Sequence, residues 1–146
     1  MFQSETYSIL DCYFIEKGSS KSNYVSGTNL TLSDGVFRLE KTSSSNYFYL
    51  NIPKNDFPIA DFVGNHLTVA LDCIELNAPS LILTLYDYDG TSWGNSQSAN
   101  ISSVGTLTTG ITVRSNAEQV RIRIDVNLSG SIGDNATFKD FRLVLD

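Results

Sequence analysis

The 146-residue sequence has few of the residues that mark metal sites and membrane spans. It contains two cysteines and one histidine, with no Cys-x-x-Cys pair, which argues against a zinc site. No apolar run approaches the roughly 18 residues that cross a bilayer. The first ten residues lack the basic and apolar regions of a signal peptide. We therefore expect no membrane insertion and no leader, and a domain cut from a larger surface protein is compatible with these features.

Positive charge is also scarce. Ten Lys and Arg residues stand against 16 Asp and Glu residues, giving a net charge of −6. Such a chain repels phosphate backbones, so we expect no nucleic-acid partner. The length suits a single domain over residues 1–146. The 19 Ser, 12 Thr and 12 Asn residues are typical of secreted, cell-surface and virion proteins, and they predict an extracellular, cell-surface or virion location.

Helical periodicity is absent, and a period of two dominates instead. Residues 47–52, 66–74 and 120–126 each alternate an apolar with a more polar position, as half-buried strands do. Turn signals rich in Gly, Ser, Asn and Asp separate the segments. We predict about nine or ten strands, at 7–15, 28–32, 36–41, 46–52, 66–74, 81–88, 101–107, 111–114, 119–127 and 137–145.

Short antiparallel strands with such turns predict an all-β protein, an antiparallel two-sheet β-sandwich of the jelly-roll type. Segment 81–88 places Leu residues on one face and Ile, Thr and Tyr on the other. Because both faces are partly apolar, we expect a central strand there. The "SDG" at 33–35 predicts a tight hairpin turn.

The two cysteines, Cys12 and Cys73, lie in phase with apolar neighbours on their predicted strands. Free cysteine packs as a small apolar residue, so two buried thiols are one interpretation. A disulfide between them is the other, and the sequence leaves both open.

The C-terminal half resembles the closing strands of jelly-roll carbohydrate-binding modules. The resemblance lies in "VGTLTTGITVRSNAEQVRIRIDV" (104–126) and "GDNATFKDFRLVLD" (133–146), where an F-x-D motif precedes alternating apolar residues. "LSDGVFRLEK" (32–41) is similar to the first hairpin of these modules. The same shape occurs in tail-fibre, baseplate and adhesin proteins. The resemblance implies a sugar-binding face and a structural calcium ion.

In the modules that the chain resembles, the aspartate of the F-x-D motif is often a calcium ligand. That role would fall on Asp140, with Asp11 or Glu5 as N-terminal partners. Calcium requires six to eight oxygen ligands, and the remaining ligands cannot be named from the sequence. The alternative for Asp140 is an exposed strand aspartate. Apart from this calcium ion, we expect no cofactor.

The stretch "YDYDGTSW" (86–93) has the Asp-x-Asp spacing that begins an EF-hand loop. Counting from Asp87 places Ser at the sixth and twelfth positions, where Gly and Glu are needed. Counting from Asp89 supplies Gly94 at the sixth position but Asn100 at the twelfth. No flanking helices are predicted, which excludes the EF-hand.

A sugar platform explains the same stretch better. Sugars stack their apolar C–H faces on aromatic rings, and their hydroxyl groups bind polar side chains. If the strands share one sheet, their wetter faces bring together one candidate set: Tyr47, Tyr49, Asp72, Tyr86, Tyr88, Trp93, Arg121, Arg123 and Asp125. The structural alternative also stands: the tyrosines pair across strands, the arginines pair with the aspartates, and the tryptophan caps the core.

Catalytic signatures are missing. His66 opens a strand, and no Ser or Cys lies in a nucleophile motif. No two carboxylates form a pair that would support glycoside hydrolysis. We therefore predict a non-catalytic carbohydrate-binding module whose partner is a polysaccharide or other glycan. The alternative is a virion or cell-surface structural or adhesion module, in which the same face packs on copies of the chain or on other subunits.

Overall fold

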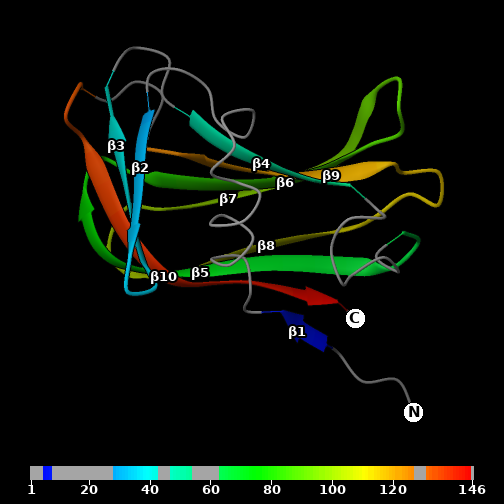
Figure 1. Ribbon diagram of the computed structural model, residues 1–146, viewed down its shortest axis with the longest axis horizontal. Helices are drawn as coiled ribbons and strands as arrows, with labels where there is room; N and C mark the ends of the chain where they lie inside the picture. Colours follow the sequence, from blue (N-terminus) through cyan, green and yellow to red (C-terminus); the bar gives the residue numbers. More distant parts are fainter. Residues whose placement is uncertain (1–4, 8–27, 43–46, 54–62, 127–130, 146) are drawn as a thin grey trace.

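The computed structural model describes residues 5–7, 28–42, 47–53, 63–126 and 131–145, and these residues form β-strands and no helix (Figure 1). The strands are β1 (Glu5–Tyr7), β2 (Thr28–Ser33), β3 (Val36–Lys41), β4 (Tyr47–Pro53), β5 (His66–Asn77), β6 (Leu81–Tyr88), β7 (Trp93–Ile101), β8 (Gly105–Thr112), β9 (Gln119–Asp125) and β10 (Asn135–Leu145). For β1 and β4, only the backbone course and the register are described. The prediction of an all-β, antiparallel chain is confirmed.

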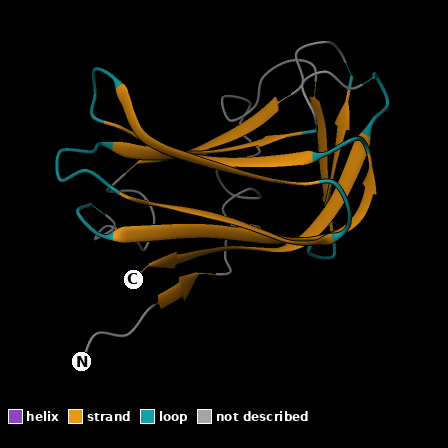
Figure 2. Cartoon of the chain, turned by 180° about the vertical axis from the view of Figure 1, so that it is seen from behind, coloured by secondary structure: helices purple, strands orange, loops and turns teal. Residues whose placement is uncertain are grey.

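The strands form two sheets that pack face to face (Figure 2). Sheet A has the order β2-β3-β10-β5-β8, with β1 also pairing with β10. Sheet B has the order β4-β9-β6-β7. β6 lies between β9 and β7, so the predicted central position of segment 81–88 is confirmed. Apolar side chains from the two inner faces fill the space between the layers, as in other sandwiches.

β10 connects distant parts of sheet A. Its first half pairs with β3 and its last residues pair with β1, while β5 runs along its other side. The register with β5 shifts between Lys139 and Arg142, and Asp140 has a φ of 51°. This irregularity is a β-bulge, which bends the strand.

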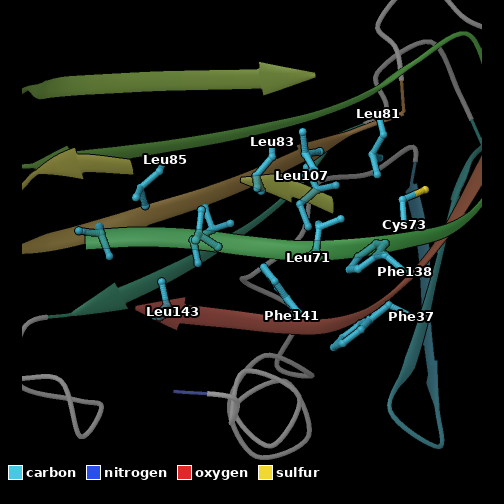
Figure 3. Packing of buried hydrophobic residues seen from close by; sticks show 14 of the residues in the cluster. Phe37, Leu71, Cys73, Leu81, Leu83, Leu85, Leu107, Phe138, Phe141 and Leu143 are labelled. Carbon is cyan, nitrogen blue, oxygen red and sulfur yellow. The ribbon is translucent and has the colours of Figure 1, made fainter. Parts of the chain in front are cut away.

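The core is centred on three phenylalanine rings and rows of leucine (Figure 3). The rings of Phe37 and Phe138 stack with centroids 5.1 Å apart, and Phe141 meets Phe138 edge-on at 5.9 Å. Cys73 is a buried free cysteine beside this cluster, and burial raises the pKa of its thiol. Cys12 lies outside the described residues.

The hairpin signal at 33–35 folds as expected. Ser33 pairs with Val36 across a two-residue turn, in which Asp34 and Gly35 have φ values of 52° and 77°. Two left-handed residues in sequence are the geometry of a type I′ turn, which Asp-Gly adopts readily.

The third quarter of the chain differs from the prediction. Residues 102–104, inside the strand expected at 101–107, form the turn between β7 and β8, and β8 joins the end of that segment to the strand expected at 111–114. Most of the segment expected as a loop is β7 itself. β7 is an edge strand whose side chains are mostly exposed, so its sequence "WGNSQSANI" carries no apolar alternation. The strand expected at 7–15 overlaps the described residues only at its first position. Among the described residues, no helix has the length and apolar character needed to cross a membrane.

Candidate functional site

The outer face of sheet B carries the aromatic residues that the sequence singled out. On β6, Leu81, Leu83 and Leu85 are fully buried against sheet A. The intervening side chains, including Tyr86 and Tyr88, therefore lie on the opposite, outer face. Figures 1 and 2 show the hairpin that joins β6 to β7 bending away from sheet A, so this outer face is curved.

Strand register assembles an aromatic cluster on that face, formed by Tyr86, Tyr88, Trp93 and Arg121. Tyr88 pairs with Trp93 across β6 and β7, and Tyr86 pairs with Arg121 across β6 and β9. The Trp93 ring centroid lies 5.0 Å from that of Tyr86 and 4.5 Å from that of Tyr88. Trp93 remains 40% exposed, which is high for a residue of its size in a sheet.

Arg121 is the polar member of the cluster. Its guanidinium carbon lies 4.3 Å from the centroid of Trp93 and 5.9 Å from that of Tyr86. Both distances fall within the range of attractive cation–π contacts. The arginine therefore fixes the orientation of the indole and covers part of one ring face.

The next row along the strands is polar. Arg123 pairs with Thr84 in register, and the hydroxyl groups of Thr84 and Ser98 lie 2.8 Å apart. The Nε atom of Arg123 donates to Asp125 Oδ2 at 3.0 Å. This arginine is thus held in place beside the aromatic cluster.

Asp125 was predicted to lie on a solvent-exposed face, but the structure buries it. It has the phase of Arg121 and Arg123, yet it is only 2% exposed, and its Oδ1 has no hydrogen-bond partner among the described residues. Desolvation raises the pKa of this carboxyl, and the nearby Arg123 opposes that shift. A carboxylate so enclosed cannot offer bidentate hydrogen bonds to a sugar in this conformation.

Tyr47 and Tyr49 belong to the same sheet. In the β4–β9 register, Tyr47 stands opposite Asp125 and Tyr49 opposite Arg123. The positions of all four tyrosines therefore fall on sheet B. The side chains of the two β4 tyrosines lie outside the described part of the chain.

Asp72 does not join this surface. It lies on β5 in sheet A, where it accepts a hydrogen bond from Thr106 Oγ1 at 3.0 Å. Arg142 NH1 lies 3.6 Å from the same carboxylate. The prediction placed it on a wet face, but alternation within one strand does not reveal which sheet the strand enters.

The two aspartates of "YDYDGTSW" have a structural partner that the sequence reasoning missed. Asp87 is fully buried and accepts from the backbone N–H of Arg114 at 2.9 Å and from its Nε at 2.7 Å. Asp89 lies 3.3 Å from the same guanidinium and accepts from the N–H groups of Thr91 and Ser92. Those backbone hydrogen bonds are the main cause that lowers the pKa of Asp89.

A signal for this pair exists in the sequence. Asp87 continues the core-facing phase of Leu81, Leu83 and Leu85. A carboxylate at a buried position needs a cationic partner, because an unpaired buried charge is very costly. Arg114 lies two residues after the end of β8 and contacts Asp87 there.

Comparison with known proteins identifies the fold. No family model matches the chain, and no curated protein matches its sequence. Among solved structures, a CBM4 carbohydrate-binding module superposes with a TM-score of 0.55 and 15% identity, covering 98% of this chain and 86% of that one. The fold is that of the carbohydrate-binding modules.

Two further neighbours show where this shape occurs. The CBM22-1–GH10 modules of Clostridium thermocellum xylanase 10B, solved with xylohexaose, match with a TM-score of 0.58 and 11% identity over 83% of this chain and 25% of that one. Tailspike protein 4 of bacteriophage CBA120 matches with a TM-score of 0.55 and 16% identity over 90% of this chain and 21% of that one. At these identities the likeness establishes the fold alone.

The calcium site implied by the resemblance stays a prediction, because Asp140 is its only named ligand whose side chain is described. Asp140 is exposed at the bulge of β10, and its carbonyl oxygen accepts from Arg142 at 2.7 Å. A guanidinium so close disfavours a dication, and no group of three or more His, Cys, Asp or Glu side chains in the described segments could hold a metal. Asp11 lies outside these segments, so its role stays a prediction.

Proposed function

We propose that this chain is a non-catalytic, glycan-binding module that uses the outer face of sheet B. One observation carries the proposal: Tyr86, Tyr88 and Trp93 form a cluster on an outer sheet face, with Trp93 40% exposed. Exposed aromatic clusters on a folded surface mark binding sites, and ring faces suit the C–H faces of sugars. The carbohydrate-binding modules with the same fold support this assignment.

Each side chain has a distinct role in this proposal. The part of the Trp93 ring left open by Arg121 stacks on a sugar, and Tyr88 extends the apolar area. Arg121 and Arg123 donate hydrogen bonds to hydroxyl or ring oxygens. Because the aromatic cluster is already assembled, binding immobilises few side chains, and the ordering cost is low. Affinity stays modest, since a sheet face buries only part of a sugar.

The carboxylates support a role without catalysis. Glycoside hydrolysis needs one carboxyl group as an acid and a second as a nucleophile or base. Near the aromatic cluster, Asp87 and Asp89 are engaged by Arg114, and Asp125 is engaged by Arg123. A binding role also assigns the chain to places where glycans are displayed, namely the extracellular space, a cell surface or a virion.

A glycan array followed by a fluorescence titration tests the proposal. Trp93 is the only tryptophan, so any change in its emission reports on this face. We expect at least one glycan to bind and to shift that emission. We expect Trp93→Ala to abolish binding to the same glycan on the array, and Arg142→Gln, on sheet A, to leave it unchanged.

The assembly alternative gives a different result. If the aromatic cluster packs against another subunit, light scattering shows oligomers that Trp93→Ala dissociates, and the array stays silent. A monomer that binds no glycan would overturn the proposal. Loss of binding in both variants would also contradict it, because Arg142 lies on the other sheet.

A further inference from the structure

A groove of about 500 Å³ lies between the open edges of the two sheets, and one of its lining residues, Ser96, pairs with Tyr86 of the aromatic cluster. β7 is the free edge of sheet B and β8 is the free edge of sheet A. The groove is lined by His66, Asn95, Ser96, Gln97, Thr109, Gly110, Ile111 and Thr112. Its volume falls in the range of small-molecule sites. Asn95 bridges the two edges, because its Nδ2 donates to the carbonyl oxygen of Thr112 at 2.7 Å.

The core-facing residues of β7 change from apolar to polar where the groove begins. The register with β6 assigns Ile101, Ala99 and Gln97 to its core-facing positions, opposite Leu81, Leu83 and Leu85. Ala99 and Ile101 pack against the core and close the sandwich at one end. Gln97 is exposed. At this end, therefore, the edge between the sheets is lined by an amide in place of an apolar side chain.

Thr109 is the polar counterpart on β8. It occupies a core-facing position between Leu107 and Ile111 and is only 8% exposed. The Thr109 hydroxyl makes no hydrogen bond with the described residues, but it is not one of their buried polar atoms without a partner, so it reaches the solvent in the groove. The hydroxyl gives the groove a donor and an acceptor that a valine at this core-facing position would lack. Positions that break the local apolar rule in this way are frequently functional.

Gly110 also lines the groove but lies on the opposite face of β8 from Thr109. A Cβ atom at this position would lie 2.8 Å from Thr68 Oγ1 and 3.0 Å from both His66 Nε2 and the carbonyl oxygen of Leu67. The absence of a side chain lets β8 lie close to the His66 imidazole. His66 Nδ1 in turn lies 3.5 Å from Thr112 Oγ1.

We propose that this groove is a second binding site, specific for a neutral saccharide unit of one or two rings. None of its lining residues is Asp, Glu, Lys or Arg, so neither a strong anion nor a cation finds a fixed counter-charge. Hydroxyl and amide groups both donate and accept, which matches the hydroxyl groups of a sugar. The Nδ2 of Asn95 is used by Thr112, so its Oδ1 remains an acceptor. The site lacks an aromatic platform, and none of its lining residues belongs to the aromatic cluster of the glycan-binding face proposed above.

Two unique residues allow the sites to be tested separately. His66 is the only histidine and lines the groove, while Trp93 is the only tryptophan and belongs to the aromatic cluster. The probes are glucose, galactose, mannose, xylose, N-acetylglucosamine, cellobiose and maltose, each titrated to millimolar concentration. We expect at least one probe to shift the NMR signals of the His66 imidazole in a saturable way.

Variants separate a built site from a chance contact. Thr109→Val keeps the shape of the side chain and suits a core-facing strand position. We expect it to weaken binding of that probe by roughly five- to tenfold, because one hydrogen bond is lost. Gln97→Ala, at an exposed position, is expected to weaken it as well. Thr106→Val, on the same strand outside the groove, serves as the matched control and leaves the titration unchanged.

Two results would contradict the saccharide site in the groove. If no probe shifts His66, or if Thr109→Val and Gln97→Ala both bind as tightly as the unaltered chain, the groove is not a saccharide site. That result would leave the Trp93 titration intact, so it differs from a failure of the proposed glycan-binding face. Conversely, Trp93→Ala is expected to leave the His66 shifts in place.

Discussion

The guanidinium of Arg121 lies 4.3 Å from the ring centre of Trp93, although the two residues come from strands that do not pair with each other. β6 separates β9 from β7, and its Tyr86 contacts both residues. The contact therefore spans three strands of sheet B. It holds an exposed indole in one orientation before any ligand arrives.

Replacing Arg121 by alanine should weaken glycan binding more than it weakens folding. Loss of the hydrogen bond that Arg121 donates to the sugar costs about 1 kcal/mol, or roughly fivefold in Kd. Arg121→Lys should retain part of the affinity, because an ammonium also interacts with the ring but lacks a stacking plane. Fluorescence titration with the glycan identified on the array measures both values. An unchanged Kd for Arg121→Ala would show that the arginine does not contribute to the site.

Replacing Asp87 by alanine should strongly destabilise the chain. Asp87 is fully buried, and its loss leaves Arg114 without the carboxylate that accepts from its Nε and its backbone N–H. Breaking a buried ion pair lowers the free energy of unfolding by about 3 kcal/mol or more. We expect the lower value here because the Arg114 side chain is 26% exposed. Urea denaturation measures this loss.

A matched control comes from an exposed pair. Arg38 NH1 lies 2.6 Å from Glu40 Oε1, and the two side chains are 44% and 32% exposed. Arg38→Ala should cost less than about 1 kcal/mol in the same denaturation experiment. If both variants lose equal stability, burial is not what makes the Asp87–Arg114 pair important.

The sheet framework was predictable because its strands alternate strictly. β6 and β9 each alternate a buried row with a half-buried row, and the structure places the leucine and isoleucine rows in the core as the sequence indicates, whereas Asp87 and Asp125 are buried as well. β7 was missed because it is an edge strand with mostly exposed side chains, and only Ala99 and Ile101 of its core-facing row are apolar. Its Asn95, with a φ of 21° at an irregularity in the register, gave no local signal.

The candidate site was predictable only in part, because pairing between distant strands is not encoded in any single strand. Tyr86, Tyr88, Trp93 and Arg121 meet through the register of β6 with both neighbours. Asp72 has an equally wet position on its own strand but belongs to sheet A. The phase of a residue predicts its face, whereas the identity of the sheet depends on contacts far along the chain.

Asp125 provides the last prediction, which concerns pH. Its pKa is raised above 3.8 chiefly by desolvation, so the folded chain binds this proton more tightly than the unfolded chain. The free energy of unfolding therefore decreases as the pH rises from 3.8 through the raised folded pKa, and it levels off above that value. Asp125→Asn removes the titrating group and still leaves an oxygen for Arg123. The variant should gain stability relative to the unaltered chain across that window and keep the gain at neutral pH.

Thermal and urea unfolding from pH 3 to pH 8 measure this difference. Asp34→Asn, at an exposed left-handed turn position that asparagine also tolerates, corrects for the general effect of deleting one negative charge. After that correction, the advantage of Asp125→Asn should grow as the pH rises. If instead the unaltered chain gains on the variant with rising pH, the attraction of Arg123 outweighs desolvation. Asp125 would then be a stabilising ion-pair partner and no longer a carboxylate held at a cost beside the glycan-binding face.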